Sequence, residues 1–261
     1  MRLTKKSLIR LVILFLPLCS FAQQKKDSTG IIANKIFNFQ FHYTYEMPGG
    51  DLAQTFGTIH NIGFGCLFKT KRNWTYSLDG SYQFGYYVSD YINQSIQGNI
   101  GNSSGSISNL SGGNALVYLG ERGLNAFIKA GKIFPLPGKN LNSGISLMAG
   151  IGFVSHMINI NAPMNDVPTL TDDLKKGYDR LTMGWALTQF AGYHFHSHYR
   201  LVNFYIGFDL IEAFTKNIRG YNYDQMSYDK AQKLDIYFGP RFGWMIPIYM
   251  TTKEVDEFYY K

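Results

Sequence analysis

Residues 34–46 alternate without a break between aromatic and polar side chains. The aromatic positions are Phe37, Phe39, Phe41, Tyr43 and Tyr45. Successive side chains of an extended chain point to opposite faces, so this pattern predicts a strand with one aromatic face and one polar face. A half-buried strand of a soluble sandwich also alternates, but it rarely needs an aromatic residue at every apolar position.

The same alternation recurs along the chain and predicts eight strands. They span residues 34–46, 58–70, 74–87, 123–134, 144–160, 181–195, 201–214 and 233–249. Long connections (47–57, 88–122, 161–180 and 215–232) alternate with short ones (71–73, 135–143 and 196–200). We interpret 88–122 mainly as loop, although 114–119 is apolar enough to extend the next strand, and 171–178 could form a helical turn.

Long loops at one end and short turns at the other are typical of outer-membrane barrels, and an even strand count returns both termini to the periplasm. A soluble lipocalin-like barrel would turn its apolar face inward and need not sort its loops in this way. The expected fold is therefore all-β, an eight-stranded antiparallel up-and-down transmembrane barrel. Its long loops would be extracellular and its short turns periplasmic.

The first 22 residues are typical of an export signal. Four basic residues precede an apolar run at 11–16, and Ser20 and Ala22 supply the small residues of a cleavage site before Gln23. A lipoprotein signal ending at Cys19 is the alternative, but the bulky Leu18 precedes that cysteine. We expect a signal peptide at 1–22, a short periplasmic segment at 23–33, the barrel at 34–249 and a periplasmic tail at 250–261.

Removal of the signal changes the charge of the chain. The full sequence has 25 basic and 18 acidic residues; without the four basic residues of the signal, 21 basic residues remain and the net charge falls from +7 to +3. This balance gives little support for nucleic acid as a partner. Cys66 is the single cysteine after residue 22, so the sequence predicts no internal disulfide and no cysteine-based metal site.

The polar face of the predicted barrel carries six ionisable groups. They are Glu46, Asp79, Lys129, Asp209, Asp235 and Arg241. Buried charges persist when they are paired or well hydrogen-bonded, so we expect an internal network of salt bridges that plugs the lumen. A gated or proton-conducting path is the alternative. An open diffusion pore is not expected, because eight strands enclose a space that side chains can fill.

Three histidines occupy alternate positions at 194, 196 and 198, close to a predicted turn. Such a spacing can serve a metal, but a metal site needs further rigid ligands. His196 with Ser197 has the composition of a base and a nucleophile, yet no carboxylate lies beside them in sequence to orient the base. We therefore expect solvated interfacial histidines, and we assign no catalytic, cofactor or metal residue.

The last predicted strand carries a pattern that resembles the C-terminal β-signal of assembled barrels. It consists of Arg241, Gly243, Ile246 and Ile248, a polar residue and a glycine followed by two hydrophobic residues two positions apart. Over 34–249 the chain resembles the small outer-membrane β-barrels common in Bacteroidota, akin to the OmpA/OmpX-like and PorT-like families. The resemblance implies insertion by the barrel-assembly machinery and contact with outer-membrane lipid and lipopolysaccharide.

Two features depart from that pattern. Residues 250–261 continue beyond the last strand, and Pro240 and Pro247 each remove a ladder donor within it. We expect a bulge or a weak seam there, or a strand that ends before Pro247. The expected function is a non-enzymatic structural or accessory component of an envelope assembly, for example in secretion, with an envelope protein as partner. An outer-membrane lipid-modifying hydrolase and a narrow channel are the alternatives.

Overall fold

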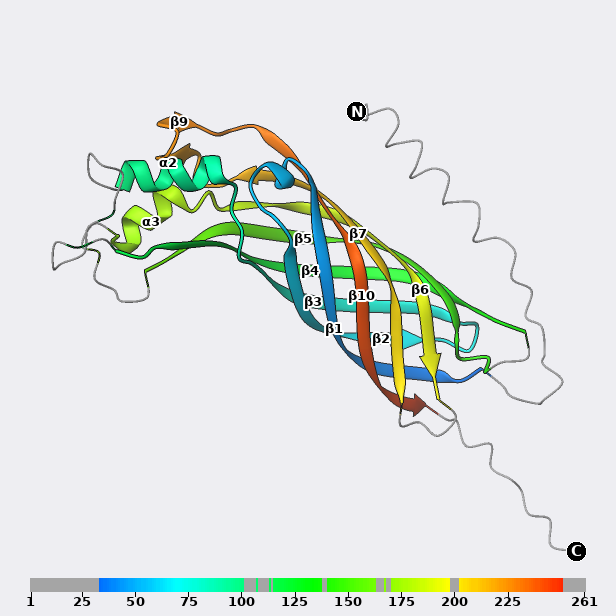
Figure 1. Cartoon of the computed structure of the whole chain (residues 1–261). Helices are drawn as coiled ribbons and strands as arrows, with labels where there is room; N and C mark the ends of the chain where they lie inside the picture. The colour runs from blue at the N-terminus through cyan, green and yellow to red at the C-terminus, as the bar shows by residue number, and fades with distance from the viewer. Residues whose placement is uncertain are drawn as a thin grey trace, which may run out of the picture.

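The computed structural model of the chain describes residues 33–100, 107, 113, 115–137, 140–162, 167, 170–197 and 202–250. The expected signal peptide at 1–22 and nearly all of the expected tail at 250–261 lie outside these residues. Figure 1 shows one long barrel with a cap of short elements at one end.

Eight long antiparallel strands close the barrel. They are β1 (Lys35–Gly50), β2 (Ile59–Lys69), β3 (Trp74–Gly85), β4 (Tyr118–Pro135), β5 (Gly144–Asn161), β6 (Thr182–His196), β7 (Asn203–Asn217) and β10 (Gln232–Met250). Each strand pairs with its neighbour in sequence, and β1 also pairs with β10 to close the ring. The predicted eight-stranded up-and-down barrel is therefore confirmed.

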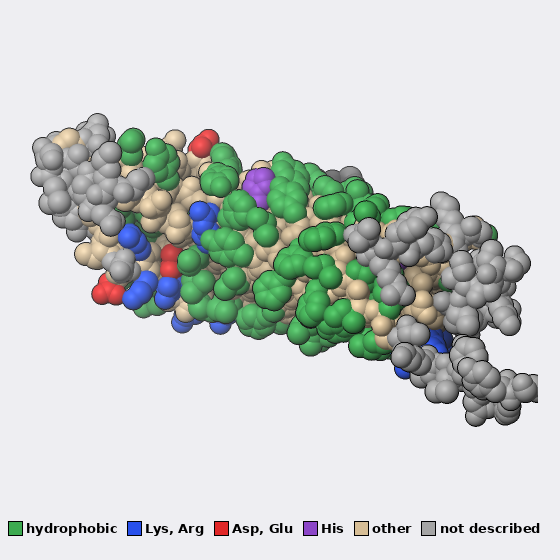
Figure 2. Space-filling view, turned by 90° about the horizontal axis from the view of Figure 1, so that it is seen from below, with side chains coloured by type: hydrophobic (Ala, Val, Ile, Leu, Met, Phe, Trp, Pro, Cys, Tyr) green, Lys and Arg blue, Asp and Glu red, His purple; other side chains and the backbone are tan. Residues whose placement is uncertain are grey.

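The alternating residues are sorted as the sequence pattern predicts. In β1 the polar side chains from Asn38 to Glu46 are buried in the lumen, while Phe39, Phe41 and Tyr43 face outward. Every strand of the ring carries a large apolar side chain that is 52–69% exposed. The most exposed on each strand are Phe41, Phe64, Leu78, Ile128, Ile151, Trp185, Phe208 and Phe242. Figure 2 shows a broad apolar band across the face of the barrel that is in view.

Long and short connections alternate, and the long ones lie at one end, which we call the loop end. They hold the 3₁₀ turn η2 (Leu52–Gln54), helix α2 (Asp90–Ile100), helix α3 (Asp172–Tyr178) and the small hairpin of β8 (Tyr221–Asn222) and β9 (Ser227–Tyr228). The helical turn expected at 171–178 is thus present. The interpretation of 88–122 mainly as loop is wrong where α2 runs from Asp90 to Ile100. The start of β4 at Tyr118 agrees with the expectation that 114–119 could extend the next strand.

These elements form a cap that packs on the barrel. Ile92 and Ile96, one turn apart on α2, are buried in a hydrophobic cluster with Leu52, Phe56 and Ile59. The α2 helix is also tied to the hairpin, because Ser95 Oγ donates a hydrogen bond of 3.1 Å to the carbonyl oxygen of Asp224. The cap therefore has an apolar core of its own that is continuous with the loop end of the barrel.

Helix α3 joins the cap through its two ends. The hydroxyl of Thr171 accepts a hydrogen bond from the Leu174 amide and caps the first turn. At the last turn Tyr178 packs edge-on against Tyr223, with 5.7 Å between ring centroids, and Tyr223 N donates to Gly177 O at 3.0 Å. Among the described residues no helix is long and apolar enough to cross a membrane.

The two prolines of β10 do not end the strand or shift its register. The strand continues to Met250, so the expected end before Pro247 is wrong, and constant pairing with β7 through Pro240 leaves no bulge there. The ladder between β1 and β10 is nevertheless interrupted beside Pro240, between the pairs Thr44↔Arg241 and Met47↔Phe238. Pro247 lies beyond the last pair with β7, where one edge of β10 is unpaired and proline is tolerated.

Candidate functional site: the lumen plug and the loop-end cavity

Four of the six predicted lumen charges meet in one cluster, which we call the plug. It joins Asp79 of β3, Lys129 of β4, Asp209 of β7 and Arg241 of β10. The Lys129 ammonium lies 3.3 Å from Asp79 Oδ2 and 3.5 Å from Asp209 Oδ2. The Arg241 guanidinium donates to Asp209 at 2.5 Å and to Asp79 at 3.5 Å.

The plug closes the lumen. Its two carboxylates and two cations balance, and each side chain is at most 6% exposed. Tyr205 and Phe190 pack beside it, and Arg241 Nε donates to the Tyr205 hydroxyl at 3.3 Å. The cavity that adjoins these groups measures about 10 Å³, which is room for about one water molecule. This geometry favours a closed barrel over a conducting path.

Glu46 and Asp235 are also inside the barrel but lie apart from the plug. Glu46 accepts hydrogen bonds from Asn61 Nδ2 at 2.8 Å and from Gln83 Nε2 at 2.7 Å. Asp235 Oδ2 accepts from Thr215 Oγ1 at 2.5 Å and lies 2.9 Å from His156 Nε2. The six predicted residues therefore form three separate groups.

The buried lumen groups that the sequence prediction missed include His156 and Glu121. Both side chains face inward, at 6% and 0% exposure. The parity that places Lys129 and Asn125 inside also places Glu121 inside, so continuing the alternation of β4 upstream would have found it. The same reasoning along β5 would have found His156.

The expectation of solvated histidines near residue 196 is wrong for the two that are described. Strand β6 keeps its alternation through His196, so His194 and His196 are both inside the barrel at 1% exposure. His194 stacks on Tyr205 with 5.0 Å between ring centroids, and His196 Nε2 lies 3.4 Å from the Asn38 amide oxygen. His198 lies outside the described residues.

These contacts lend no support to a metal site or a hydrolytic site at this position. No group of three histidine, cysteine or carboxylate side chains that could hold a metal occurs among the described residues. The described ring contact of His196 is to an amide, and its backbone amide donates to Ser143 Oγ at 2.8 Å. The orienting carboxylate that a base requires is not among the contacts of this ring in the described part of the chain.

The residues that resemble an assembly signal divide between the two faces of β10. Arg241 belongs to the plug, and Gly243 faces the Tyr205 ring, where a Cβ would lie 2.2 Å from ring carbons. Ile246 and Ile248 face outward at 42% and 49% exposure. Half of the pattern therefore packs the lumen, and half lies on the apolar exterior.

A second feature is a cavity of about 380 Å³ at the loop end. Side chains from the β1–β2 connection, the start of α2, β5, the start of β6 and the β9–β10 segment line it. One wall is apolar, with Leu52, Phe56 and Ile92. The polar part of the lining includes Arg180 and Asp235.

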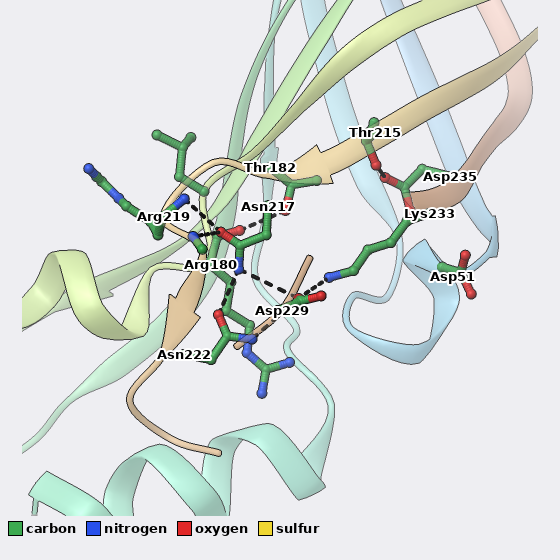
Figure 3. A network of polar contacts seen from close by, with 12 residues as sticks. Asp51, Arg180, Thr182, Thr215, Asn217, Arg219, Asn222, Asp229, Lys233 and Asp235 are labelled. Atoms are coloured by element: carbon green, nitrogen blue, oxygen red, sulfur yellow. Dashed lines mark hydrogen bonds and ion pairs between the residues drawn. The ribbon is translucent and has the colours of Figure 1, made fainter. Parts of the chain in front are cut away.

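Ion pairs fix the loops around this cavity (Figure 3). Arg180 pairs with Asp224 of the β8–β9 hairpin, and Arg219 Nη2 donates to Asp179 Oδ2 at 2.7 Å. That hydrogen bond raises the pKa of the Arg219 guanidinium above its ordinary value. The pairs connect loops that are far apart in sequence, so they hold separate parts of the cap together.

Asp229 and Lys233 form an ion pair that lines the cavity directly after the β8–β9 hairpin. The Lys233 ammonium lies 2.7 Å from Asp229 Oδ2, and the amides of Asn217 and Asn222 donate to the same oxygen at 3.5 and 3.3 Å. Burial by itself would raise the pKa of Asp229, but the Lys233 ammonium and the amide donors outweigh it and hold the pKa below its ordinary value. The carboxylate is therefore well stabilised in its charged form.

A closed ring of strands with apolar side chains outside and paired charges inside has the polarity of a membrane-spanning β-barrel. In water, an apolar band around the whole barrel would far exceed the exposed patches of soluble monomers. The class of protein that the fold defines is thus a small barrel of the transmembrane kind.

The chain matches no family model and no curated protein sequence. Among solved structures, it is similar to Ail, the attachment invasion locus protein of Yersinia pestis, at 9% identity and a TM-score of 0.42, over 81% of this chain and 99% of that one. Ail in complex with the heparin analogue sucrose octasulfate matches at 10% identity and a TM-score of 0.39, over the same shares of the two chains.

Neisserial surface protein A is similar at 8% identity and a TM-score of 0.42, over 80% of this chain and 96% of that one. At such low values of identity and TM-score, the fold assignment rests on the strand pairing of this chain itself.

Proposed function

We propose that the protein is a non-enzymatic integral barrel of the bacterial outer membrane that serves as a structural or accessory component of an envelope assembly. In this proposal the loop end faces outward and both termini lie in the periplasm. Insertion by the barrel-assembly machinery, a lipopolysaccharide surround and an envelope protein partner, in secretion for example, belong to the same proposal. So does membership of the OmpA/OmpX-like or PorT-like barrels.

The observation that carries this proposal is the plug. A barrel whose lumen is filled by two carboxylates, two cations and aromatic rings has no path for solutes, so its work has to be done at its ends or on its outer face. The loop end is the structured end, because ion pairs and an apolar cluster hold the cap there. Exposed elements on a rigid scaffold are where recognition usually resides.

Single-channel recording in planar bilayers tests the closed lumen. We expect purified protein to give no steady conductance, because the cavity beside the plug holds about one water molecule. The double variant Lys129→Ala/Arg241→Ala removes both cations and should raise the frequency of opening events. The variant Lys216→Ala, at an exposed position on β7, is the matched control. Stable, ion-selective conductance of the wild-type protein would contradict the proposal and restore the channel hypothesis.

A further inference from the structure

The charges around the loop-end cavity do not balance. Four carboxylates line it or pair with its lining: Asp51, Asp224, Asp229 and Asp235. Two strong cations face them, and each is already engaged, Arg180 by Asp224 and Lys233 by Asp229. Among the described residues Asp51 and Asp235 therefore lack a lysine or arginine partner.

The remaining acceptors lie near one another. Asp235 of β10 pairs with Gly50 of β1, and Asp51 is the next residue after Gly50. Asp51 Oδ2 accepts a hydrogen bond from Leu234 N at 2.8 Å, which holds its carboxylate beside β10. In Figure 3 the Lys233 side chain extends toward Asp229 and points away from Asp51 and Asp235. Asp51 Oδ1 also accepts from Gln54 Nε2 at 3.5 Å. The cavity thus keeps two carboxylates with spare acceptor capacity, one directly after the end of β1 and one on β10.

A third acceptor belongs to the same wall. His156 Nε2 is engaged by Asp235, and His156 Nδ1 is buried and has no hydrogen-bond partner among the described residues. Asp235 Oδ1 likewise receives no hydrogen bond from that part of the chain, since both of its described contacts are to Oδ2. Buried polar atoms are normally satisfied, so this wall calls for a group that donates hydrogen bonds.

The other walls suit an apolar body. Leu52 and Ile92 are almost fully buried on the cap side, and the Phe56 ring lies edge-on to His156 with 5.6 Å between centroids. Tyr91 lines the same space with a largely exposed ring, and aromatic faces attract cations. A volume of about 380 Å³ lies in the range of small-molecule sites.

We propose that this cavity binds a small organic amine, with its ammonium group held by Asp51 and Asp235 and its apolar portion against Leu52, Phe56 and Ile92. The inference deepens the proposed function, since it names a ligand class for the loop end of a closed barrel. A neutral saccharide could use the amides of the lining, but it would leave the surplus negative charge uncompensated. The donor-seeking carboxylates therefore favour an amine.

Titration calorimetry of the full barrel in nanodiscs tests the proposal, with empty nanodiscs subtracted. The probe is 2-phenylethylamine, compared with neutral 2-phenylethanol, anionic 3-phenylpropionate and the disaccharide maltose. We expect saturable binding of the amine, with the alcohol and the acid each at least about tenfold weaker. The alcohol lacks the positive charge of the ammonium, and the acid brings a further negative charge to the carboxylates.

Substitutions locate the site. Asp235→Asn and Asp51→Asn should each weaken amine binding about tenfold, and Asp173→Asn, on the exposed side of α3, should leave it unchanged. Asp235 is buried and its variant could fail to fold, so heat-modifiable electrophoresis checks each variant, and the half-buried Asp51 provides an independent test. Equal binding of amine and alcohol, no loss in a folded Asp51→Asn variant, or preferred binding of maltose would overturn the proposal.

The two proposals can fail separately. If the barrel gives no conductance and does not bind the amine, the proposed ligand class is wrong and the proposal of a closed scaffold stands. If the barrel conducts ions and binds the amine, the proposal of a closed scaffold is wrong and the proposed amine site stands.

Discussion

At the residue scale, Arg241 is the side chain on which the plug depends most. It donates to both carboxylates of the cluster and to Tyr205, while almost no water reaches any of these groups. Low exposure strengthens the attraction between the charges but also makes an unpaired partner costly. The arginine fork suits this position because its several donors can serve different acceptors at once.

We predict that Arg241→Met lowers the free energy of unfolding by about 3–5 kcal/mol, because two carboxylates then share a single cation in the lumen. Urea titration of detergent-refolded protein, followed by tryptophan fluorescence, measures this value without the assembly machinery. Lys216→Met, at an exposed position, should stay within about 0.5 kcal/mol of wild type. A loss as small as that of the control would show that the plug contributes little to stability.

At the element scale, the seam between β1 and β10 contains a close backbone approach at Gly239. A Cβ added at Gly239 would lie 1.8 Å from the Tyr45 carbonyl oxygen, beside the interruption at Pro240. At Gly80, on the outer face of β3, a Cβ would meet nothing within 4 Å. The two glycines therefore form a matched pair, one required by contact and one not.

We predict that Gly239→Ala destabilises the barrel by about 1–3 kcal/mol, because the seam has to open to admit the methyl group. Gly80→Ala should be neutral or slightly stabilising, because alanine restricts the unfolded chain. The temperature at which the compact band converts to the unfolded band in heat-modifiable electrophoresis compares them. Identical transition temperatures would show that the seam is not under this constraint.

The strands were predictable from sequence because hydrocarbon outside and packed side chains inside impose a period of two on every one of them. In β1, for example, the alternation alone places Phe41 outside the barrel and His42 inside it. The loop-end elements were less predictable, since α2 has a weak apolar stripe of Ile92 and Ile96 within a polar helix. Its position depends on contacts with η2 and β2 that are distant in sequence.

The candidate site divides in the same way. Alternation placed Asp79, Lys129, Asp209 and Arg241 inside, but it could not say which of the six charges meet, since this depends on the stagger between strands around the ring. It therefore grouped Glu46 and Asp235 with the plug, although their partners are Gln83 and His156. The loop-end cavity was not predicted at all, because five separated segments build it.

At the scale of the whole molecule, the barrel is a rigid base and the cap is a set of loops held by ion pairs. Among these pairs the Asp229–Lys233 contact joins the end of the β8–β9 hairpin to the start of β10. The pKa of Asp229 is lower in the folded protein than in the unfolded chain. Its stabilising contribution is therefore complete above the unfolded pKa of about 3.9 and is lost as the pH falls through the lower folded value.

We predict that acid releases the hairpin before the barrel unfolds. A nitroxide spin label at Ser227→Cys, in a Cys66→Ala background, should be immobile near neutral pH and gain mobility as the pH drops below about 3.9. Asp229→Asn should make the label mobile across the whole range, since its side chain cannot carry the charge. A label that responds to acid equally in both backgrounds would assign the effect to another group.

Arg241 stands on the strand that completes the circle, whereas two of its partners stand on β3 and β7. During insertion, Asp79 and Asp209 therefore gain their second cation only when β10 has joined the ring of strands. Arg241, one of the residues that resemble an assembly signal, therefore stabilises the closed ring of strands relative to a ring that β10 has not yet completed.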